Sequence, residues 1–334
     1  MQSINRPHYY STQTMNKPSE VILIQTLGVP RELVQQRFAE ILPGHSLVWK
    51  GSELAEGKAL ADLVGNAKYL ITGSLPIDGQ TIRNCALSMI SISFTGYDHV
   101  DLAACREKGI AVYNTPGYST DSVAELALGL ALSLLRNIPK GDSHARQTEE
   151  KFYAFPNGTE LKGKTVGIVG TGATGRAAAR LFAAFGCKVL GYNRAKKEEF
   201  IKLGGTYCGL DDLLKNSDIV SLHLALNAET KHIMNAERIA KMKPSAYLIN
   251  TARGGLIDEA ALAKALNKNE LAGAGLDVFG SEPPAKDNPL LTAQNTVLTP
   301  HLGYKTDEAL LRKLEVTFRN IADFENGIGT NRVA

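Results

Sequence analysis

The chain has 334 residues, of which 44% are apolar and 21% charged, and its formal net charge is +3. This length predicts two domains that each bury a core. So small a charge excludes nucleic acid and membrane surfaces as electrostatic partners. The four cysteines have no metal-binding or redox spacing, so we expect reduced thiols, no metal site and a cytoplasmic location.

The N-terminal part of the chain alternates strand and helix patterns. Residues 1–20 are polar and lack the apolar segment of a signal peptide, so we expect a flexible tail. Short apolar runs predict strands at 21–25, 46–49, 69–72, 89–93 and 110–113. Such alternation predicts a parallel sheet covered by helices. No stretch of the sequence is apolar for long enough to predict a membrane span.

A strongly apolar helix is predicted at 122–136, where Ser122 and Glu125 have the spacing of a capping box. Beyond this start the helix is apolar on every face. A helix that is apolar all round must be buried all round, which requires contacts with both domains or with a second subunit. We therefore predict a homodimer formed through this helix.

A G-x-G-x-x-G motif lies in mid-chain, between an apolar run that predicts a buried strand and a small, apolar helix pattern. Gly170 is expected to make the tight turn, Gly172 to admit a pyrophosphate to the backbone, and Gly175 to let the helix lie close to the strand. Ala173 and Thr174 begin the helix, whose free N–H groups and positive dipole end would hold the phosphates. The motif predicts dinucleotide binding.

The next predicted strand, 187–192, ends where such folds meet the adenosine ribose. The chain has Asn193 at this point, where an NAD-preferring site has Asp or Glu. Without that acid a 2′-phosphate is not repelled, and Arg194 can bind the phosphate or stack on adenine. We therefore predict NADP(H) as the preferred cofactor, with NAD(H) as a second possibility. The alternative is a solvated basic turn that simply lacks the acid.

Three polar residues follow three successive strand patterns in the C-terminal half. Strands are predicted at 166–169, 187–192, 218–224, 246–251, 273–278 and 296–298. Arg253, Glu282 and His301 come directly after the last three of them. Because parallel strands end at one edge of a sheet, and ligands bind at that edge, we expect these side chains to converge. A final helix, 307–326, is expected to pack back on the first domain.

A cation, a carboxylate and an imidazole together suit the reduction of an α-keto acid. Arg253 can pair both oxygens of a substrate carboxylate and stays charged. His301 can give a proton to the nascent alkoxide, because imidazole titrates near neutral pH. Glu282 would stabilise the charged imidazole and fix its tautomer.

Several ordered stretches resemble the D-isomer-specific 2-hydroxyacid dehydrogenases, over nearly the whole chain. These stretches are 95–101, 114–117, 122–125, 170–175, 250–255, 275–279 and 299–303. The resemblance implies that Arg253, Glu282 and His301 are catalytic. It also implies that Thr251, Ala252 and Asp277 meet the cofactor, Asp277 at the nicotinamide carboxamide.

The resemblance further implies an α/β fold of two Rossmann-like, doubly wound parallel-sheet domains with an active-site cleft between them. A flavodoxin-like substrate domain would comprise 21–118 plus 304–334, and an NAD(P)-binding domain 119–303. Backbone N–H groups around Thr95 and Gly96 would hold the substrate carboxylate. The family often has glycine where this chain has Phe94, which implies a tighter or more apolar carboxylate loop.

The expected function is reduction of a small 2-keto acid, of the glyoxylate or hydroxypyruvate type, to the D-2-hydroxy acid. Three alternatives stay open from the sequence. One is a dinucleotide-sensing binding protein of the co-repressor type on the same scaffold. Another is a lyase or hydrolase that keeps dinucleotide bound, and the third is a dehydrogenase for a larger keto acid.

Overall fold

The computed structural model describes residues 19–55, 58–147 and 155–334. The chain divides into two compact units, of which one comprises the chain up to Pro116 with Leu311–Ala334 and the other Gly117–Leu310. The second boundary falls later than the expected 303/304, because it lies inside a helix that begins at Asp307. Most of the expected tail, 1–20, lies outside the described residues, and Glu20 already belongs to the first strand.

The first unit contains a five-stranded parallel sheet in the order β2-β1-β3-β4-β5, which is the flavodoxin-like order. The strands are β1 (Glu20–Leu23), β2 (Ser46–Trp49), β3 (Tyr69–Thr72), β4 (Met89–Ile92) and β5 (Ala111–Tyr113). The helices are α1 (Arg31–Ile41), α2 (Gly51–Ala55), α3 (Leu60–Val64), α4 (Gly79–Arg83), α5 (Leu102–Lys108) and α13 (Asp307–Glu325).

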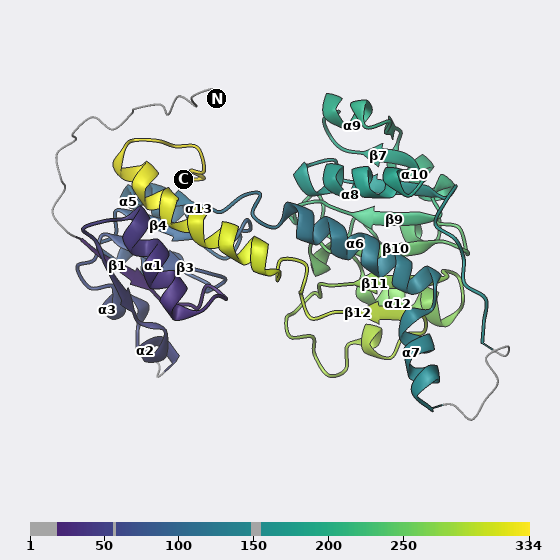
Figure 1. Cartoon of the computed structure of the whole chain (residues 1–334), viewed down its shortest axis with the longest axis horizontal. Helices are drawn as coiled ribbons and strands as arrows, with labels where there is room; N and C mark the ends of the chain where they lie inside the picture. The colour runs from purple at the N-terminus through teal and green to yellow at the C-terminus, as the bar shows by residue number, and fades with distance from the viewer. Residues whose placement is uncertain (1–18, 56–57, 148–154) are drawn as a thin grey trace, which may run out of the picture. The chain divides into compact units, whose positions relative to one another are not determined.

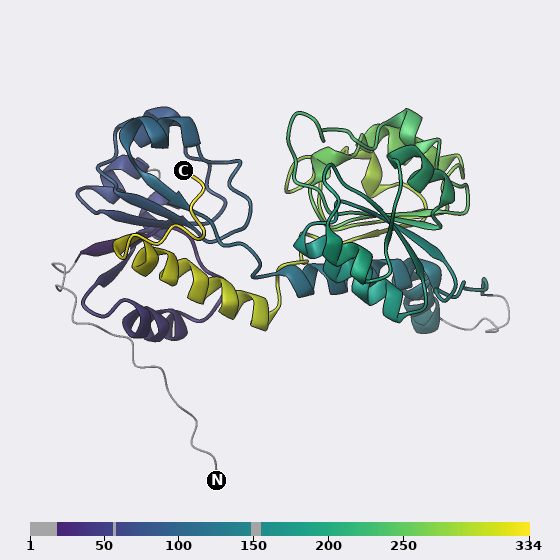
Figure 2. The same ribbon diagram turned by 90° about the horizontal axis from the view of Figure 1, so that it is seen from above.

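Helices cover both faces of this sheet (Figure 2). On one face α1 and α13 pack together, and the rings of Phe38 and Phe318 meet edge to face at 5.3 Å. On the opposite face Leu60, Ile82 and Cys105 bring α3, α4 and α5 onto the strands. Burial on both faces explains why the strands are continuous apolar runs rather than alternating patterns.

The last residues of the chain lie along the outer edge of β5. Val333 N–H donates to the carbonyl of Val112 at 2.8 Å, and Val112 N–H donates to Ala334 at 3.1 Å. Tyr113 and Arg332 form an antiparallel bridge between the two segments. The edge of the sheet is therefore hydrogen-bonded by the chain itself.

Helix α13 carries a buried lysine, Lys313, whose side chain is 2% exposed and whose Nζ lies 4.8 Å from the ring centroid of Phe94. Burial lowers the pKa of Lys313 to about 8. Between that pH and the ordinary lysine value the unfolded chain binds more protons than the folded one, so the stability of the protein rises with pH there. Below this window Lys313 is charged in the folded protein as well, so the full cost of burying that charge lowers the stability of the protein.

We expect Lys313→Met to raise the free energy of unfolding at pH 7 by about 2 kcal/mol, because it removes that buried charge. The variant is also expected to lose the rise in stability between pH 8 and 10. Urea unfolding at several pH values measures both effects. The exposed Lys268 supplies the control, Lys268→Met, which is expected to change neither. A less stable Lys313→Met variant would contradict the argument.

The second unit contains a seven-stranded parallel sheet in the order β12-β11-β10-β9-β6-β7-β8. The strands are β6 (Thr165–Val169), β7 (Lys188–Tyr192), β8 (Thr206–Tyr207), β9 (Ile219–Leu222), β10 (Tyr247–Asn250), β11 (Gly273–Leu276) and β12 (Thr296–Leu298). The chain order reverses between β6 and β9, as in a doubly wound dinucleotide-binding fold. The expected fold class of two parallel α/β sheets is confirmed, whereas β8 was not predicted.

Helices also cover both faces of the second sheet (Figure 1). The helices of this unit are α6 (Thr120–Leu135), α7 (Ile138–Gln147), α8 (Ala173–Ala184), α9 (Glu198–Lys202), α10 (Leu210–Asn216), α11 (Ala236–Ile239) and α12 (Glu259–Asn267). Helices α6 and α8 share one core cluster with the sheet, and α10, α11 and α12 share the cluster on the opposite face. Short 3-10 turns occur at Gly254–Leu256 and Pro289–Leu291.

The predicted capping box of α6 is wrong. The helix begins at Thr120, with Ser119 as an N-cap that makes no side-chain capping bond, and the Ser122 hydroxyl donates to the Ser119 carbonyl at 3.1 Å. The helix packs against α8 and β10–β12, and Leu126 and Leu132 remain partly exposed in the single chain. No single helix among the described residues is long and apolar enough to cross a membrane; α6 and α7 pass that test only as a pair bent by 56°.

Candidate active site

The glycine-rich loop joins β6 to α8. Gly170 has φ +99°, and its N–H donates to the carbonyl of Tyr192 on β7 at 2.8 Å. A Cβ at Gly175 would collide with the Gly170 carbonyl, so only glycine lets α8 begin this close to the strand. Gly172 is the N-cap of α8, and no side-chain hydrogen bond caps the helix at this end. A Cβ added there would meet nothing within 4 Å, so the backbone beside it is open.

A tyrosine that was not predicted as part of the site is hydrogen-bonded to this loop. The hydroxyl of Tyr207, on β8, lies 2.6 Å from Thr171 Oγ1 and accepts a hydrogen bond from Lys197 N–H at 2.9 Å. Tyr207 thus links the glycine-rich loop to the segment that follows β7. No motif marks this contact, because it depends on a strand of only two residues.

The loop after β7 contains the residues predicted to meet the ribose. The Asn193 amide donates to the carbonyl of Ala195 at 2.7 Å, which closes the turn. The guanidinium of Arg194 is 90% exposed and lies 3.5 Å from the carboxylate of Glu229. Arg194 is therefore free to move to a ligand, but an anion at this position would have to compete with Glu229.

Arg253 follows β10 in a loop that is shaped by its neighbours. The buried Asn250 side chain accepts from Ala252 N–H at 3.0 Å and donates to the Arg253 carbonyl at 2.9 Å. One guanidinium N–H of Arg253 donates to Ala252 at 2.8 Å. A Cβ at Gly254 would collide with the backbone of Phe279, so the loop after β10 lies directly against the loop after β11.

The structure brings Glu282 and His301 together, as the order of the strands predicts. Glu282 Oε2 lies 2.6 Å from His301 Nδ1, and Glu282 Oε1 accepts from Phe279 N–H at 3.2 Å. An ionised carboxylate can only accept hydrogen bonds, so Nδ1 carries the proton of this contact. Both side chains are more than one-third exposed. The Nε2 side of the imidazole is thus left for a ligand.

The loop that carries His301 is built around Asp277, which is 1% exposed. Asp277 Oδ1 accepts from Thr299 Oγ1 at 2.6 Å and from Leu302 N–H at 2.7 Å, and Oδ2 accepts from Gly303 N–H at 2.8 Å. His301 N–H donates to the Asp277 carbonyl, and His301 has φ +54°. A left-handed conformation is costly for histidine, and these bonds hold it in place.

Two tyrosines in this unit were not predicted as part of the site. The ring of Tyr304 packs edge to face on the ring of His301, with centroids 5.6 Å apart. Burial raises the pKa of Tyr118, Tyr304 raises it further and Arg253 lowers it, so Tyr118 lies in the fields of both residues. Neither tyrosine belongs to a motif with a known chemical role, so no local pattern predicts them as part of the site.

The edge of the second sheet also has two buried polar atoms that lack a hydrogen-bond partner among the described residues. They are Thr251 Oγ1, after β10, and His223 Nδ1, after β9. Burial lowers the pKa of His223 to about 4, so its imidazole is neutral at pH 7. Unsatisfied polar atoms beside an open glycine-rich loop fit a dinucleotide that would supply their partners.

Comparison with known proteins decides the family. Residues 128–303 match the model of the D-isomer specific 2-hydroxyacid dehydrogenase, NAD binding domain. A glyoxylate reductase from Korarchaeum cryptofilum is 36% identical over 306 residues, which are 90% of this chain and 92% of that protein. The chain belongs to the D-isomer-specific 2-hydroxyacid dehydrogenases.

Two further proteins are also similar to this chain over most of its length. A hydroxypyruvate reductase from Blautia hydrogenotrophica is 35% identical over 297 residues, covering 87% of this chain and 92% of that protein. The crystal structure of D-lactate dehydrogenase from Aquifex aeolicus, complexed with NAD and lactic acid, has a TM-score of 0.81 and 32% identity. That match covers 94% of this chain and 98% of the other. The protein is therefore an oxidoreductase that uses a nicotinamide dinucleotide.

In the first unit of this dehydrogenase, the loop after β4 holds the residues predicted to bind the substrate carboxylate. Thr95 Oγ1 donates to Thr115 at 3.0 Å, and the Asn114 amide donates to the Thr95 carbonyl at 2.7 Å. Gly96 follows and is half-buried. The ring of Phe94 packs toward Gly73, where an added Cβ would approach it to 3.1 Å. The phenylalanine thus lies against the residue that follows β3.

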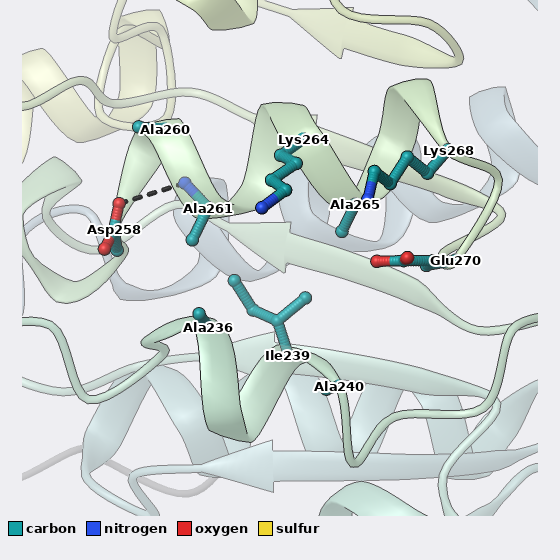
Figure 3. A pocket seen from close by; sticks show the side chains of 10 residues that line it. All are labelled: Ala236, Ile239, Ala240, Asp258, Ala260, Ala261, Lys264, Ala265, Lys268 and Glu270. Carbon is teal, nitrogen blue, oxygen red and sulfur yellow. Dashed lines mark hydrogen bonds between the residues drawn. The ribbon is translucent and has the colours of Figure 1, made fainter.

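A hollow of about 400 Å³ lies between α11 and α12 of the dehydrogenase (Figure 3). Ala236 and Ile239 form one wall, and Lys264 and Lys268 stand on the other. None of the predicted site residues lines this hollow. The described residues also include no group of three or more His, Cys, Asp or Glu that is placed to hold a metal ion.

Proposed function

We propose that this dehydrogenase reduces a small 2-keto acid, of the glyoxylate or hydroxypyruvate type, to the D-2-hydroxy acid. The hydrogen-bonded Glu282–His301 pair carries the proposal, because it lies at the carboxyl edge of a dinucleotide-binding sheet. The names of the relatives from Korarchaeum and Blautia supply the substrate class. These relatives do not favour the co-repressor, lyase or hydrolase alternatives.

Each residue at the edge of the sheet has a separate task in this proposal. A dinucleotide with its phosphates at the glycine-rich loop would supply a hydride from its reduced nicotinamide to the keto carbon. Arg253 pairs with the substrate carboxylate and polarises the keto group. His301 gives a proton from Nε2 to the carbonyl oxygen, and Glu282 stabilises the charged ring before transfer. Backbone N–H groups at Thr95 and Gly96 also bind the carboxylate.

We propose that the cofactor phosphates bind to the N-terminus of α8, at Gly172, Ala173 and Thr174. Thr251 and Ala252 follow β10 at the same edge, and the unpartnered hydroxyl of Thr251 is available to the cofactor. Asp277 remains a predicted contact of the nicotinamide carboxamide, although its oxygens already accept three hydrogen bonds from the His301 loop.

NADPH is the donor that we propose, since the loop after β7 has no acid at Asn193 and offers the guanidinium of Arg194. Asn193→Asp is expected to shift the ratio of kcat/KM values toward NADH by about tenfold, because a carboxylate repels a 2′-phosphate. Glu229→Gln is expected to shift the ratio in the opposite direction, since it releases Arg194. Initial rates with both dinucleotides measure the shifts.

The exposed Asn216, at the end of α10, supplies the control for added charge. Asn216→Asp is expected to leave the NADPH-to-NADH ratio unchanged. An unchanged ratio in Asn193→Asp would show that the loop after β7 does not select the cofactor.

The substrate class is tested by the loss of NADPH and NADH absorbance at 340 nm. Glyoxylate, hydroxypyruvate, pyruvate and phenylpyruvate are compared at matched concentration. Fast oxidation with glyoxylate or hydroxypyruvate is the expected result. Preference for phenylpyruvate would favour a larger keto acid, and no oxidation with any of the four would contradict the proposed function.

We also propose a cytoplasmic homodimer. The four cysteines are free thiols, and burial raises the pKa values of Cys105 and Cys187 to about 11, which fits inert thiols in a reducing compartment. The partly exposed row of α6, which includes Leu126 and Leu132, is the surface proposed for the second subunit. Light scattering coupled to gel filtration measures the mass of the particle.

A further inference from the structure

Tyr304 lies three residues after His301, on the loop that Asp277 holds. Its ring stands at 82° to the imidazole of His301, with centroids 5.6 Å apart. The turn is closed by Lys305 N–H, which donates to the Leu302 carbonyl at 2.8 Å, and the ring is half-buried. The backbone turn and the ring contact therefore both hold Tyr304 beside His301.

The charges around Tyr304 are those of the active site. Burial raises the pKa of Tyr304, and the carboxylates of Asp277 and Glu282 raise it further, so the phenol stays neutral. Tyr304 also acts electrostatically on Tyr118, and so does Arg253. Tyr304 therefore lies close to residues of the proposed site, although no step of the reaction uses it.

The Glu282 contact alone does not fix the imidazole. It is made by a side chain that is itself 37% exposed and can move with the ring, and the terminal torsion of histidine has broad energy wells. His301 is 38% exposed, so solvent leaves the ring room to rotate. An aromatic ring packed edge to face limits that rotation, because aromatic pairs favour edge-to-face and offset-stacked arrangements over others.

We propose that Tyr304 is a positioning residue that sets the plane of the His301 imidazole, so that Nε2 is held toward the substrate oxygen. This inference rests on the proposed role of His301 as proton donor. It assigns the effect to the ring of Tyr304 and not to its hydroxyl. Proton transfer then depends on two neighbours of His301, with Glu282 bonded to Nδ1 and Tyr304 packed against the ring.

The test compares Tyr304→Leu with Tyr304→Phe. Leucine removes the ring and is expected to lower kcat about tenfold, the factor that corresponds to an aromatic pair realised fully in the transition state. The KM of the keto acid and the Kd of NADPH are expected to stay within about twofold. Phenylalanine keeps the ring and is expected to retain kcat. Tyr247→Leu, at the start of β10, removes a tyrosine ring elsewhere in the same unit and is the control.

A double-mutant cycle separates positioning from general damage. If Tyr304 acts through His301, Tyr304→Leu is expected to cost nothing further in the His301→Ala background. An equal loss in both backgrounds would overturn the proposal. So would a loss in Tyr304→Phe as large as that in Tyr304→Leu, which would assign the effect to the hydroxyl. A raised KM at unchanged kcat would also overturn it, since the ring would then contact substrate.

Proton NMR tests the contact without turnover. The ring signal of His301, assigned by its absence in His301→Ala, is expected to shift in Tyr304→Leu and to move little in Tyr304→Phe and Tyr247→Leu. An unshifted signal in Tyr304→Leu overturns the inference. Failure of the parent protein to reduce any keto acid would instead refute the proposed function, while the NMR result would still decide whether the ring of Tyr304 contacts that of His301.

Discussion

Replacement of His301 by alanine is expected to lower kcat with the best keto acid by at least ~10²-fold, the range of general acid–base catalysis. The imidazole lies at the edge of the sheet where ligands bind, and Glu282 holds it by Nδ1, so that Nε2 is left to give the proton. The Kd of NADPH is expected to change little, because the glycine-rich loop and the loop after β7 are untouched. Stopped-flow turnover and fluorescence titration measure the two quantities.

His232→Ala is the matched control for this substitution. His232 is an exposed histidine of the same unit, and its φ of +49° is close to the +54° of His301. The control therefore reproduces the loss of an imidazole from a left-handed position. Full activity in His301→Ala would show that another group supplies the proton.

Asp277→Asn is expected to lower kcat by about 10²-fold, because a displaced reacting group costs about that factor. The amide has one acceptor atom, so it cannot replace both oxygens toward Thr299, Leu302 and Gly303. At least one buried N–H then loses its partner, and the turn that holds His301 relaxes. Steady-state kinetics and the Kd of NADPH are measured together.

The exposed Asp287, on a neighbouring loop, gives the control Asp287→Asn, which is expected to change neither quantity. A raised Kd of NADPH at unchanged kcat would identify Asp277 chiefly as a cofactor contact. A fall in kcat at unchanged Kd identifies it as the residue that shapes the His301 loop.

The sequence is informative where local pattern and strand order determine the result. Continuous apolar runs identify the parallel strands, and the spacing of Gly170, Gly172 and Gly175 identifies the turn between β6 and α8. The meeting of Glu282 and His301 follows from a general rule, since β11 and β12 are neighbours and end at the same edge.

Other features depend on tertiary contacts that no local pattern records. The loop around Asp277 is held largely by backbone N–H groups, which every sequence possesses. Tyr304 acts by ring packing, and Tyr207 reaches Thr171 from a strand of only two residues. The spacing of Ser122 and Glu125 fits a capping box, yet α6 starts earlier, with Asp121 in its first turn, where an acid is favoured by the helix dipole.

The segment that lies along β5 has a consequence for how copies of this protein behave at high concentration. An open strand edge is a template on which another molecule can add a strand, and such pairing leads to aggregates. Here the N–H and carbonyl groups of Val112 are already bonded to Val333 and Ala334. The chain thus covers this edge of the sheet itself, which leaves β5 unavailable as a template for a strand of another molecule.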